Sequence, residues 1–319
     1  MSAPEQRRVG QPVKLGRVVL VRKSTAVEQQ AHRPDRRLAR LIGAGDPLAA
    51  RVLGAHAEHV ASLALVEQEL QARHIDYRVV SRLGRREAQQ ADLVVTVGGD
   101  GTFLRASHAV EPTARSDGPP MLGVNSASGS SAGYFCACTA ADFGQVLDRI
   151  AAGSVKSHGL WRLQVAINGK MIREHALNDV LLAHHSPAET SRYALEVNGQ
   201  HQDQKSSGLW VATAAGSTAA IRSAGGMLLD VDARAMQYRV RELMLWAVEG
   251  EPLEGGIVQE LQVISRMYNG MIYIDGGHFR QKFGFGDRVQ FRLTERPLPW
   301  VAPGELHDRR RKWLTRSAG

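Results

Sequence analysis

Residues 93–102 read Leu-Val-Val-Thr-Val-Gly-Gly-Asp-Gly-Thr, a segment that joins an apolar run to a glycine-rich turn. The β-branched run predicts a buried strand, and the three glycines that follow surround Asp100. Glycines let the backbone pass close to a ligand, so that its N–H groups can point at phosphate oxygens. A carboxylate beside bound phosphate is costly unless it handles a proton or a metal ion. This segment therefore indicates phosphoryl chemistry.

The sequence around this segment alternates short apolar runs with helical patterns. Asp46 followed by Pro47 predicts the start of a helix, since an acidic cap and a proline in the first turn are preferred there. Alternating strands and helices predict a parallel sheet with covered faces, whose ligands bind beyond the carboxyl ends of the strands. Gly98 lies at such an end. The expected strands are 17–21, 77–80, 93–97 and 121–124, and the expected helices are 47–73 and 139–150.

Turn signals dominate the sequence after Gly153. Asn-Gly and Asp-Gly pairs separate alternating apolar runs, and such pairs are the strongest short-range signal of a β-hairpin. The pairs stand at 168–169, 198–199, 269–270 and 275–276, and strands are expected at 160–167, 193–197 and 271–274. This part of the chain is therefore expected to be mostly antiparallel β. We place an α/β domain at 1–153, a β-rich domain at 154–301 and a basic C-terminal tail at 302–319.

The composition fits a globular protein with a basic surface. The 319 residues are 43% hydrophobic and 23% charged, with a formal net charge of +8 at pH 7. Positive charge attracts nucleotides as well as nucleic acids, but no aromatic residues alternate with the basic ones, so we expect no nucleic acid partner. No apolar run approaches the roughly 20 residues that span a bilayer, so we expect no membrane partner.

Two features of the sequence bear on the cellular compartment. Residues 1–16 lack the apolar core of a secretory signal. Cys136 and Cys138 are separated by one residue, a spacing that suits neither a metal pair nor a strain-free disulfide. We therefore expect free thiols in a reducing compartment and a cytoplasmic protein.

A polar pair interrupts the apolar run at 176–182, which reads Ala-Leu-Asn-Asp-Val-Leu-Leu. Asn and Asp are depleted in strands, so Asn178 and Asp179 need a reason. One interpretation is that Asp179 accepts hydrogen bonds from the vicinal hydroxyls of a ribose, as acids do in dinucleotide sites. The alternative is a bulge or a strand end in which Asn178 satisfies backbone groups.

A third segment, 208–226, passes from an apolar strand into small and hydroxyl-bearing residues. Exposed N–H groups and hydroxyls at Gly216, Ser217 and Thr218 would form a cradle for a pyrophosphate. The alternative is a tight turn with a serine or threonine cap.

These segments, together with Gly-Val-Asn at 123–125, resemble the NAD kinase family over residues 18–292 and follow the family's order. The resemblance implies a Rossmann-like parallel α/β N-terminal domain and a mostly antiparallel, sandwich-like β C-terminal domain. It implies transfer of the γ-phosphate of ATP to the 2′-hydroxyl of the adenosine ribose of NAD⁺ or NADH, with Asp100 as the catalytic carboxylate. The nucleotide-binding residues that it implies are Gly98, Gly99, Gly101, Thr102, Asn125, Asn178, Asp179, Ser207, Thr213, Gly216, Ser217, Thr218, Ala219 and Ser223.

Two positions resemble a divergent branch of the family, which includes NADH kinases and mitochondrial-type NAD kinases. The commoner members have an acid where this chain has Ser207 and a tyrosine where it has Ala220. Loss of a carboxylate near the nicotinamide weakens selection of its positively charged oxidised ring. We therefore hypothesise a preference shifted toward NADH.

The phosphates of ATP need positive charge, and the chain lacks a P-loop with its lysine. We expect Mg²⁺ or another divalent cation to arrive with ATP, with Asp100 as its candidate protein ligand. No intrinsic metal site and no tightly bound organic cofactor is expected. Arg105 and Arg222 are candidate phosphate partners, and His56 and His59 are expected to face solvent rather than a metal. The resemblance also implies a homodimer or a higher homo-oligomer.

Two other functions share part of this pattern. A diacylglycerol-type lipid kinase has the same glycine turn, but it explains neither the Asn-Asp pair nor the segment 213–220. A non-catalytic nucleotide sensor would keep the pocket, but the binding of phosphates needs no carboxylate at Asp100. At the level of the sequence both remain alternatives to the kinase acting on NAD(H).

Overall fold

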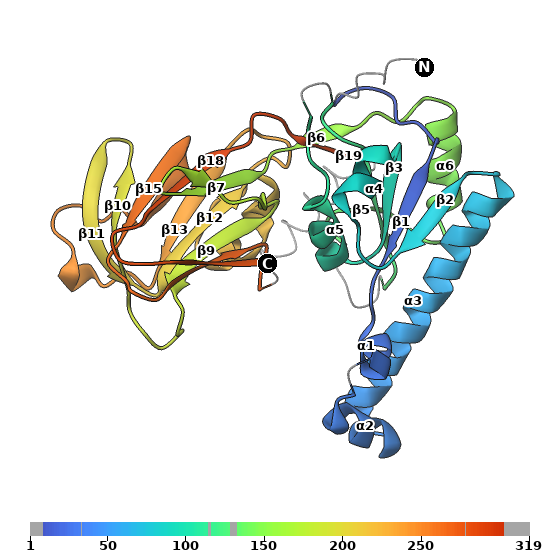
Figure 1. Ribbon diagram of the computed structural model, residues 1–319, viewed down its shortest axis with the longest axis horizontal. Coiled ribbons are helices and arrows are strands. Elements are labelled where there is room, and N and C mark those ends of the chain that lie inside the picture. Colours follow the sequence, from blue (N-terminus) through green and yellow to red (C-terminus); the bar gives the residue numbers. More distant parts are fainter. Residues whose placement is uncertain (1–8, 33, 114–115, 128–132, 278, 303–319) are drawn as a thin grey trace, which may run out of the picture. The chain divides into compact units, whose positions relative to one another are not determined.

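The computed structural model describes residues 9–32, 34–113, 116–127, 133–277 and 279–302. The chain divides into two compact units, Met1–His158 with Pro299–Gly319, and Gly159–Leu298 (Figure 1). Of the basic tail expected at 302–319, only Ala302 lies within the described residues, and residues 1–8 also lie outside them.

The first unit is built on the expected parallel sheet. Its strands follow the order β2-β1-β3-β4-β19-β6, and β5 also pairs with β4. The pairs β1–β2, β1–β3 and β3–β4 are parallel, which confirms the four strands predicted from the apolar runs, and β4–β5 is parallel as well. The strands are β1 (Val18–Arg22), β2 (Tyr77–Val80), β3 (Leu93–Gly98), β4 (Met121–Asn125), β5 (Cys136–Thr139), β6 (His158–Leu160) and β19 (Leu298–Trp300).

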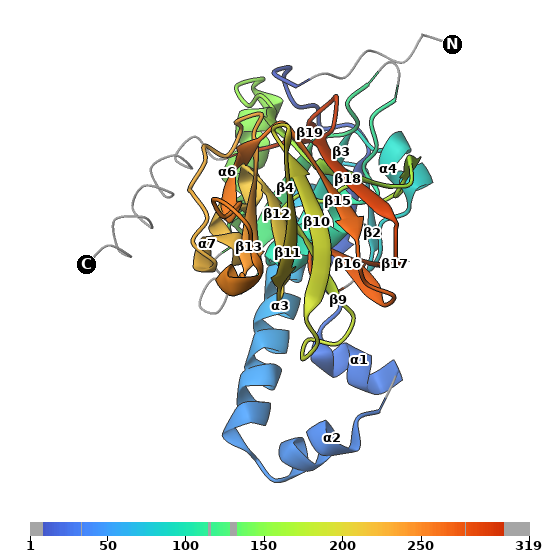
Figure 2. The same cartoon turned by 90° about the vertical axis from the view of Figure 1, so that its left-hand side faces the viewer.

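Helices cover both faces of this sheet. On one face Val66 and Leu70 of α3 pack with Phe143 and Leu147 of α6 over the strands β1, β3 and β4. The helix α5 packs against the same three strands, and α1 and α2 lie beside the first half of α3 (Figures 1 and 2). The helices are α1 (Ala26–His32), α2 (Arg36–Gly43), α3 (Pro47–Ala72), α4 (Arg85–Gln90), α5 (Asp100–Ser107) and α6 (Phe143–Ala151). None of the helices in the described residues combines the length and the apolar character needed to cross a membrane.

The helix starts were predicted with unequal success. The Asp46 side chain accepts the N–H of Leu48, and α3 begins at Pro47 as expected. The helix expected from Thr139 begins only at Phe143, because Cys136–Thr139 forms the strand β5 against β4. The Thr139 hydroxyl lies 2.7 Å from a carboxylate oxygen of Asp142, and this contact joins the end of the strand to the start of the helix.

The second unit consists of two antiparallel six-stranded sheets. Their orders are β11-β10-β15-β18-β7-β8 and β14-β13-β12-β9-β16-β17. Buried side chains of both sheets, such as Tyr193 and Phe291 from one and Leu209 and Ile272 from the other, form one hydrophobic cluster. The unit is therefore the expected β-sandwich. The strands are β7 (Leu163–Ile167), β8 (Lys170–Met171), β9 (Asp179–His184), β10 (Ser191–Val197), β11 (Gln200–Ser206), β12 (Gly208–Thr213), β13 (Met236–Arg241), β14 (Gly255–Val258), β15 (Glu260–Ser265), β16 (Gly270–Ile274), β17 (Phe279–Phe283) and β18 (Arg288–Leu293).

Three of the four predicted hairpin turns are confirmed. The first residue of each turn, which is Asn168, Asn198 or Asp275, has a positive φ near 50°, and the glycine after it has a φ between 76° and 89°. Antiparallel strands pair on the two sides of each turn. The prediction for Asn269-Gly270 is wrong, because the strands on its two sides, β15 and β16, belong to different sheets. The expected strand 160–167 is likewise two strands, β6 and β7, which also lie in different sheets.

Strands β4 and β5 approach so closely that only glycine fits at position 123. A Cβ atom on Gly123 would lie 2.8 Å from the Phe135 carbonyl oxygen and 2.9 Å from the Cys136 Cα. Both are backbone atoms, so the neighbouring strand would have to move. The close approach therefore makes this glycine a requirement of the sheet.

We predict that Gly123→Ala lowers the free energy of unfolding by about 1–3 kcal/mol, the usual cost of overpacking a core. The matched variant is Gly54→Ala, at an exposed position of α3 where a Cβ atom meets nothing within 4 Å. It should raise stability by up to about 1 kcal/mol, because alanine favours a helix more than glycine does. Urea unfolding of both variants measures the difference, and equal stabilities would contradict the close approach.

Candidate functional site

The glycine turn follows β3 and leads directly into α5. Gly98 needs to be glycine, because a Cβ atom there would collide with the side chain of Thr102. The Gly99 carbonyl accepts the N–H groups of Thr102 and Phe103 at 2.9 and 3.3 Å, so the helix begins at Asp100. At Gly101 a Cβ atom would meet no atom within 4 Å, so the backbone there is open to a ligand.

Asp100 is held in place by a residue far along the chain. Its Oδ1 accepts the backbone N–H of Phe135 at 2.8 Å. The Phe135 ring stacks on Phe103 of the same helix α5 with centroids 5.2 Å apart, and the indole N–H of Trp300 donates to the Phe135 carbonyl at 3.0 Å. Among the described residues, Oδ2 of Asp100 has no hydrogen-bond partner, so this oxygen is available to a substrate.

Asn125 lies beside the glycine turn at the end of the neighbouring strand. Parallel pairing places Asn125 opposite Gly98, and the Ser126 N–H donates to the Gly98 carbonyl at 3.2 Å. Asn125 is nearly buried, and its Oδ1 accepts the N–H of Ala127 at 3.2 Å. The structure therefore brings Gly98, Gly99, Asp100, Gly101, Thr102 and Asn125 to one edge of the sheet.

The two cysteines are free and buried. The Cys136 thiol lies 3.7 Å from the Gly98 carbonyl oxygen. Burial, together with the nearby charges of Asp100 and Cys138, raises the pKa of the Cys136 thiol far above its ordinary value. The thiol therefore stays protonated beside the turn and is not a nucleophile.

The second group of predicted residues lies in the sandwich unit, where Asp275 fixes the start of β9. The Asp275 carboxylate accepts the N–H groups of Leu177, Asn178 and Asp179 at 2.9, 2.7 and 3.3 Å. The Asp275 N–H in turn donates to the Asp179 carbonyl at 3.0 Å. The strand-end alternative for the Asn-Asp pair is therefore correct for the backbone, but the partner is Asp275 rather than the Asn178 side chain.

The segment after β12 supports the same pair from the other side. The Thr213 hydroxyl donates to the Leu177 carbonyl at 2.5 Å and accepts the Gly216 N–H at 2.9 Å. The Thr213 N–H donates to the Asn178 carbonyl at 3.0 Å. A Cβ atom at Gly216 would overlap that same carbonyl, so only glycine fits there.

The remaining residues of this segment divide into buried and exposed ones. Ser217 is fully buried, and its hydroxyl donates to the Ala214 carbonyl at 2.7 Å and accepts the Leu229 N–H at 3.1 Å. This hydroxyl holds the turn together and does not face solvent. Thr218 and Ala219 are half-buried and Ser223 is exposed, at the turn formed by the 3₁₀ helix η1 (Ala215–Thr218) and by α7 (Ala220–Ser223).

Asp179 is a buried carboxyl beside a second acid. Only 6% of the residue is exposed. Burial, with a further contribution from the charge of Asp275, raises the pKa of Asp179 to about 7. A hydroxyl donor that reached this side chain would stabilise its ionised form.

Ser207 lies between β11 and β12, next to a cationic side chain. Its N–H donates to the Arg241 carbonyl at 2.9 Å, and the Arg241 guanidinium donates to the Ser207 carbonyl at 3.4 Å. The same guanidinium lies 6.0 Å from the centroid of the Trp210 ring. Position 207, for which the resemblance implies an acid in other members of the family, is therefore close to a positive charge in this chain.

Sequence reasoning missed Phe135 and Asp275 as site residues. Phe135 acts on Asp100 through its backbone, so its side chain carries no signal of this role. The pattern at Asp275 indicated a hairpin and a family resemblance but no site residue, although its Asp-Gly pair stands near the end of a strand adjacent to β9. The expectation that His59 faces solvent is wrong, because only 1% of this residue is exposed.

Comparisons with known proteins find a matching family model and similar chains. A family model described as "ATP-NAD kinase N-terminal domain" matches residues 20–155. A probable NADH kinase of Oryza sativa subsp. japonica is 34% identical, over 78% of this chain and 82% of the relative. An NADH kinase of Arabidopsis thaliana is 31% identical, over 73% of this chain and 80% of the relative.

Two solved structures share the fold. The crystal structure of an NAD kinase from Archaeoglobus fulgidus in complex with ATP has a TM-score of 0.64 at 19% identity, over 92% of this chain and 96% of that one. The crystal structure of yeast NADH kinase complexed with NADH has a TM-score of 0.63 at 17% identity, over 96% of this chain and 89% of that one. These likenesses confirm the predicted fold class.

The raised pKa of Asp179 predicts a pH dependence of stability. The unfolded carboxyl loses its proton near its ordinary pKa of 3.8, whereas the folded one keeps it to about pH 7. The contribution of Asp179 is therefore fully present below about pH 4 and is lost as the pH rises to about 7. Relative to Asp179→Asn, the wild type should lose about 2–4 kcal/mol of unfolding free energy over this range, at about 1.4 kcal/mol per pKa unit.

Urea unfolding between pH 4 and pH 8 measures this difference. Asp232→Asn, which changes an exposed acid of the same unit, should follow the wild type at every pH. A difference between the wild type and Asp179→Asn that does not change with pH would show that the folded Asp179 titrates like an exposed acid.

Proposed function

This chain belongs to the NAD kinase family, and we propose that it transfers the γ-phosphate of ATP to the 2′-hydroxyl of the adenosine ribose of NAD⁺ and NADH. It is an NAD(H) kinase, and its products are ADP and NADP⁺ or NADPH. One observation carries the assignment of the catalytic group. Asp100 stands in the glycine turn with Oδ1 bound to the Phe135 N–H and Oδ2 without a partner among the described residues.

We assign Asp100 the role of the general base. Its free Oδ2 takes the proton of the 2′-hydroxyl as the hydroxyl oxygen bonds to the γ-phosphorus and the bond from that phosphorus to the β-phosphate oxygen breaks. Phosphoryl transfer depends mainly on positioning and on stabilisation of charge. The open backbone at Gly101 and the start of α5 supply N–H groups for phosphate oxygens.

A divalent cation with ATP is part of the proposal. Mg²⁺ prefers carboxylate and phosphate oxygens, so the phosphates of ATP would hold it, and Asp100 would orient it from beside the acceptor hydroxyl. When bound, the cation neutralises charge that develops on the phosphates. The residues of this chain then hold the acceptor hydroxyl and the backbone donors in place.

We assign the dinucleotide to the residues of the sandwich unit. The Asp179 carboxylate accepts hydrogen bonds from ribose hydroxyls, and Asn178 adds an amide beside it. Asp275, Thr213 and Gly216 hold the backbone of this pair, which supports its role as a preformed binding element.

We further propose that the enzyme works as a homodimer or higher homo-oligomer in the cytoplasm. The family resemblance supports the oligomer. The free, buried thiols of Cys136 and Cys138 support a reducing compartment.

The first test of the function is Asp100→Asn. The amide oxygen of the asparagine can still accept the Phe135 N–H, so the variant should unfold at the same urea concentration as the wild type and still bind dinucleotide. It cannot take up the proton, so kcat should fall by about 10²–10⁴-fold, the usual worth of a general base. A coupled assay for NADP(H) formation from NAD(H) and Mg-ATP measures the rate.

The matched control is Asp76→Asn, which changes an exposed acid of the same unit and should keep kcat. An Asp100→Asn enzyme with nearly normal turnover would remove Asp100 from the chemistry. A wild type that makes no NADP(H) would instead refute the kinase function itself.

The second test concerns the redox form of the substrate. Ser207→Asp restores a carboxylate that attracts the positively charged oxidised nicotinamide, so it should raise the ratio of kcat/KM for NAD⁺ to that for NADH by about 2- to 5-fold, the effect of a partly solvated ion pair. Ser207→Asn has a similar shape without the charge and should leave the ratio unchanged. An equal ratio in all three proteins would show that position 207 does not sense the nicotinamide charge.

A further inference from the structure

Lys23 follows β1 at the edge of the sheet that carries the glycine turn. Its N–H donates to the Val97 carbonyl at 2.9 Å, one residue before Gly98. Strand β3 lies between β1 and β4 in the sheet. The residue after β1 is therefore a direct neighbour of the glycine turn, on the side opposite Asn125 and Ser126.

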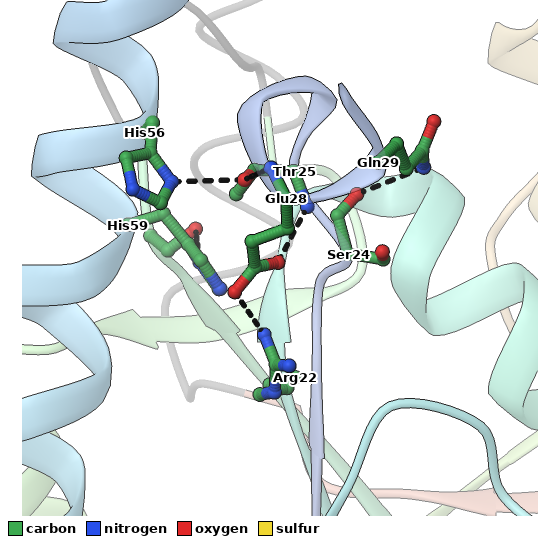
Figure 3. A network of polar contacts seen from close by, with 8 residues as sticks. Arg22, Ser24, Thr25, Glu28, Gln29, His56 and His59 are labelled. Atoms are coloured by element: carbon green, nitrogen blue, oxygen red, sulfur yellow. Dashed lines mark hydrogen bonds and ion pairs between the residues drawn. The ribbon is translucent and has the colours of Figure 1, made fainter. Parts of the chain in front are cut away.

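The cationic residue just before Lys23 is already paired. The Arg22 guanidinium donates to the carboxylate of Glu28, and the same carboxylate accepts the Thr25 N–H at 3.0 Å (Figure 3). The Thr25 hydroxyl accepts the Glu28 N–H at 3.3 Å and lies 2.8 Å from Nδ1 of His56. These contacts form a capping box at the start of α1, in which the charge of Arg22 is balanced by that of Glu28.

The charge of Lys23 is not balanced in this way. The side chain is half-buried, and no carboxylate of the described residues forms an ion pair with it. Its positive charge acts on the buried ring of His59, whose Nδ1 is 3.0 Å from the Ser126 hydroxyl (labelled His59 in Figure 3). Burial, and then the Lys23 charge, lower the pKa of His59, so the ring is neutral at pH 7.

A partly desolvated ammonium next to a neutral ring lacks the anion that would balance it. The backbone bond from Lys23 to the Val97 carbonyl places this residue beside the end of β3, where the glycine turn begins. The backbone N–H groups of the glycine turn can donate to phosphate oxygens, and a lysine ammonium adds a compact positive charge beside them. A lysine ammonium is well suited to a flexible chain of phosphates.

We propose that Lys23 binds the condensed phosphate chain of the phosphoryl donor beside the Gly98–Thr102 turn. The inference rests on the proposed function, because Asp100 acts on the acceptor hydroxyl and the phosphorus that it attacks must lie next to Asp100. The anion beside this turn is therefore the donor's triphosphate rather than the pyrophosphate of the dinucleotide.

The two arginines expected from the sequence to meet phosphate fit this role less well. Arg105 is exposed in the last turn of α5, more than one helical turn beyond Asp100. Arg222 lies in the other unit, where its guanidinium donates to the Gly226 carbonyl at 3.1 Å. Neither side chain shares the strand-end position of Lys23.

The test measures ligand binding to the full-length protein by calorimetry. The variant is Lys23→Met, which keeps the length and apolar stem of the side chain and removes its charge. We expect its Kd for ATP and for inorganic tripolyphosphate to rise by about 10- to 100-fold, the worth of one charge-assisted hydrogen bond. The Kd for NADH should change by less than about 2-fold. In the coupled assay, the KM for ATP should rise more than the KM for NADH.

Two further variants complete the experiment. Lys23→Arg keeps the charge and should restore most of the ATP affinity, and Lys170→Met removes an exposed lysine of the other unit and should bind both ligands like the wild type. Unchanged ATP and tripolyphosphate affinities in Lys23→Met overturn the inference. So does a loss of NADH affinity alone.

The remaining outcomes are also decisive. If Lys23→Met loses both ligands, recovery of ATP binding in Lys23→Arg supports the inference and failure to recover overturns it. If the wild type binds ATP but not tripolyphosphate, the donor is held by its nucleoside, and this result also overturns the inference. A wild type that binds ATP through Lys23 but makes no NADP(H) would refute the proposed function and leave the phosphate site standing.

Discussion

Two backbone hydrogen bonds at the end of β3 determine which side chains meet at the carboxyl edge of the first sheet. The Lys23 N–H donates to the Val97 carbonyl at 2.9 Å, and the Ser126 N–H donates to the Gly98 carbonyl at 3.2 Å. They come from the residues that follow β1 and β4, the two neighbours of β3. The parallel register therefore aligns three strand ends around the glycine turn, and no additional element is needed to collect them.

The two acids of the candidate sites differ in their surroundings, and this difference suits different tasks. Asp100 is half-buried, with one oxygen bound to the Phe135 N–H and the other without a described partner. Asp179 is buried beside Asp275, which raises its pKa to about 7. An acid with a free oxygen at an open turn is suited to take a proton. A buried acid, whose ionised form is stabilised by hydroxyl donors, is suited to bind a sugar. The different surroundings thus give two acids of the same type different roles.

Local pattern predicted four parallel strands of the first unit and three hairpins of the second, because alternation and positive-φ dipeptides act over a few residues. It failed for β5, whose four residues owe their strand to pairing with β4, and for Asn269, because the flanking strands join different sheets. The same limit applies to the sites. Asp275 contacts Leu177 across 98 positions, Phe135 uses its backbone across 35, and Lys23 is defined by what its neighbours leave unpaired. Such relations exist only in the folded chain.

The segment after β12 shows that a residue of a sequence motif need not contact the ligand itself. The hydroxyl of Thr213 donates to the Leu177 carbonyl. Only glycine fits at position 216, because the Asn178 carbonyl occupies the place of a Cβ atom. Ser217 is buried and bonded within its own turn. Three of the six residues in this segment that the resemblance assigns to the nucleotide therefore act on the backbone of Asn178 and Asp179 or on their own turn. Substituting them would weaken ligand binding by displacing Asn178 and Asp179. A strand end held by several hydrogen bonds passes such a displacement on to its side chains, whereas a loosely packed loop would adjust to it.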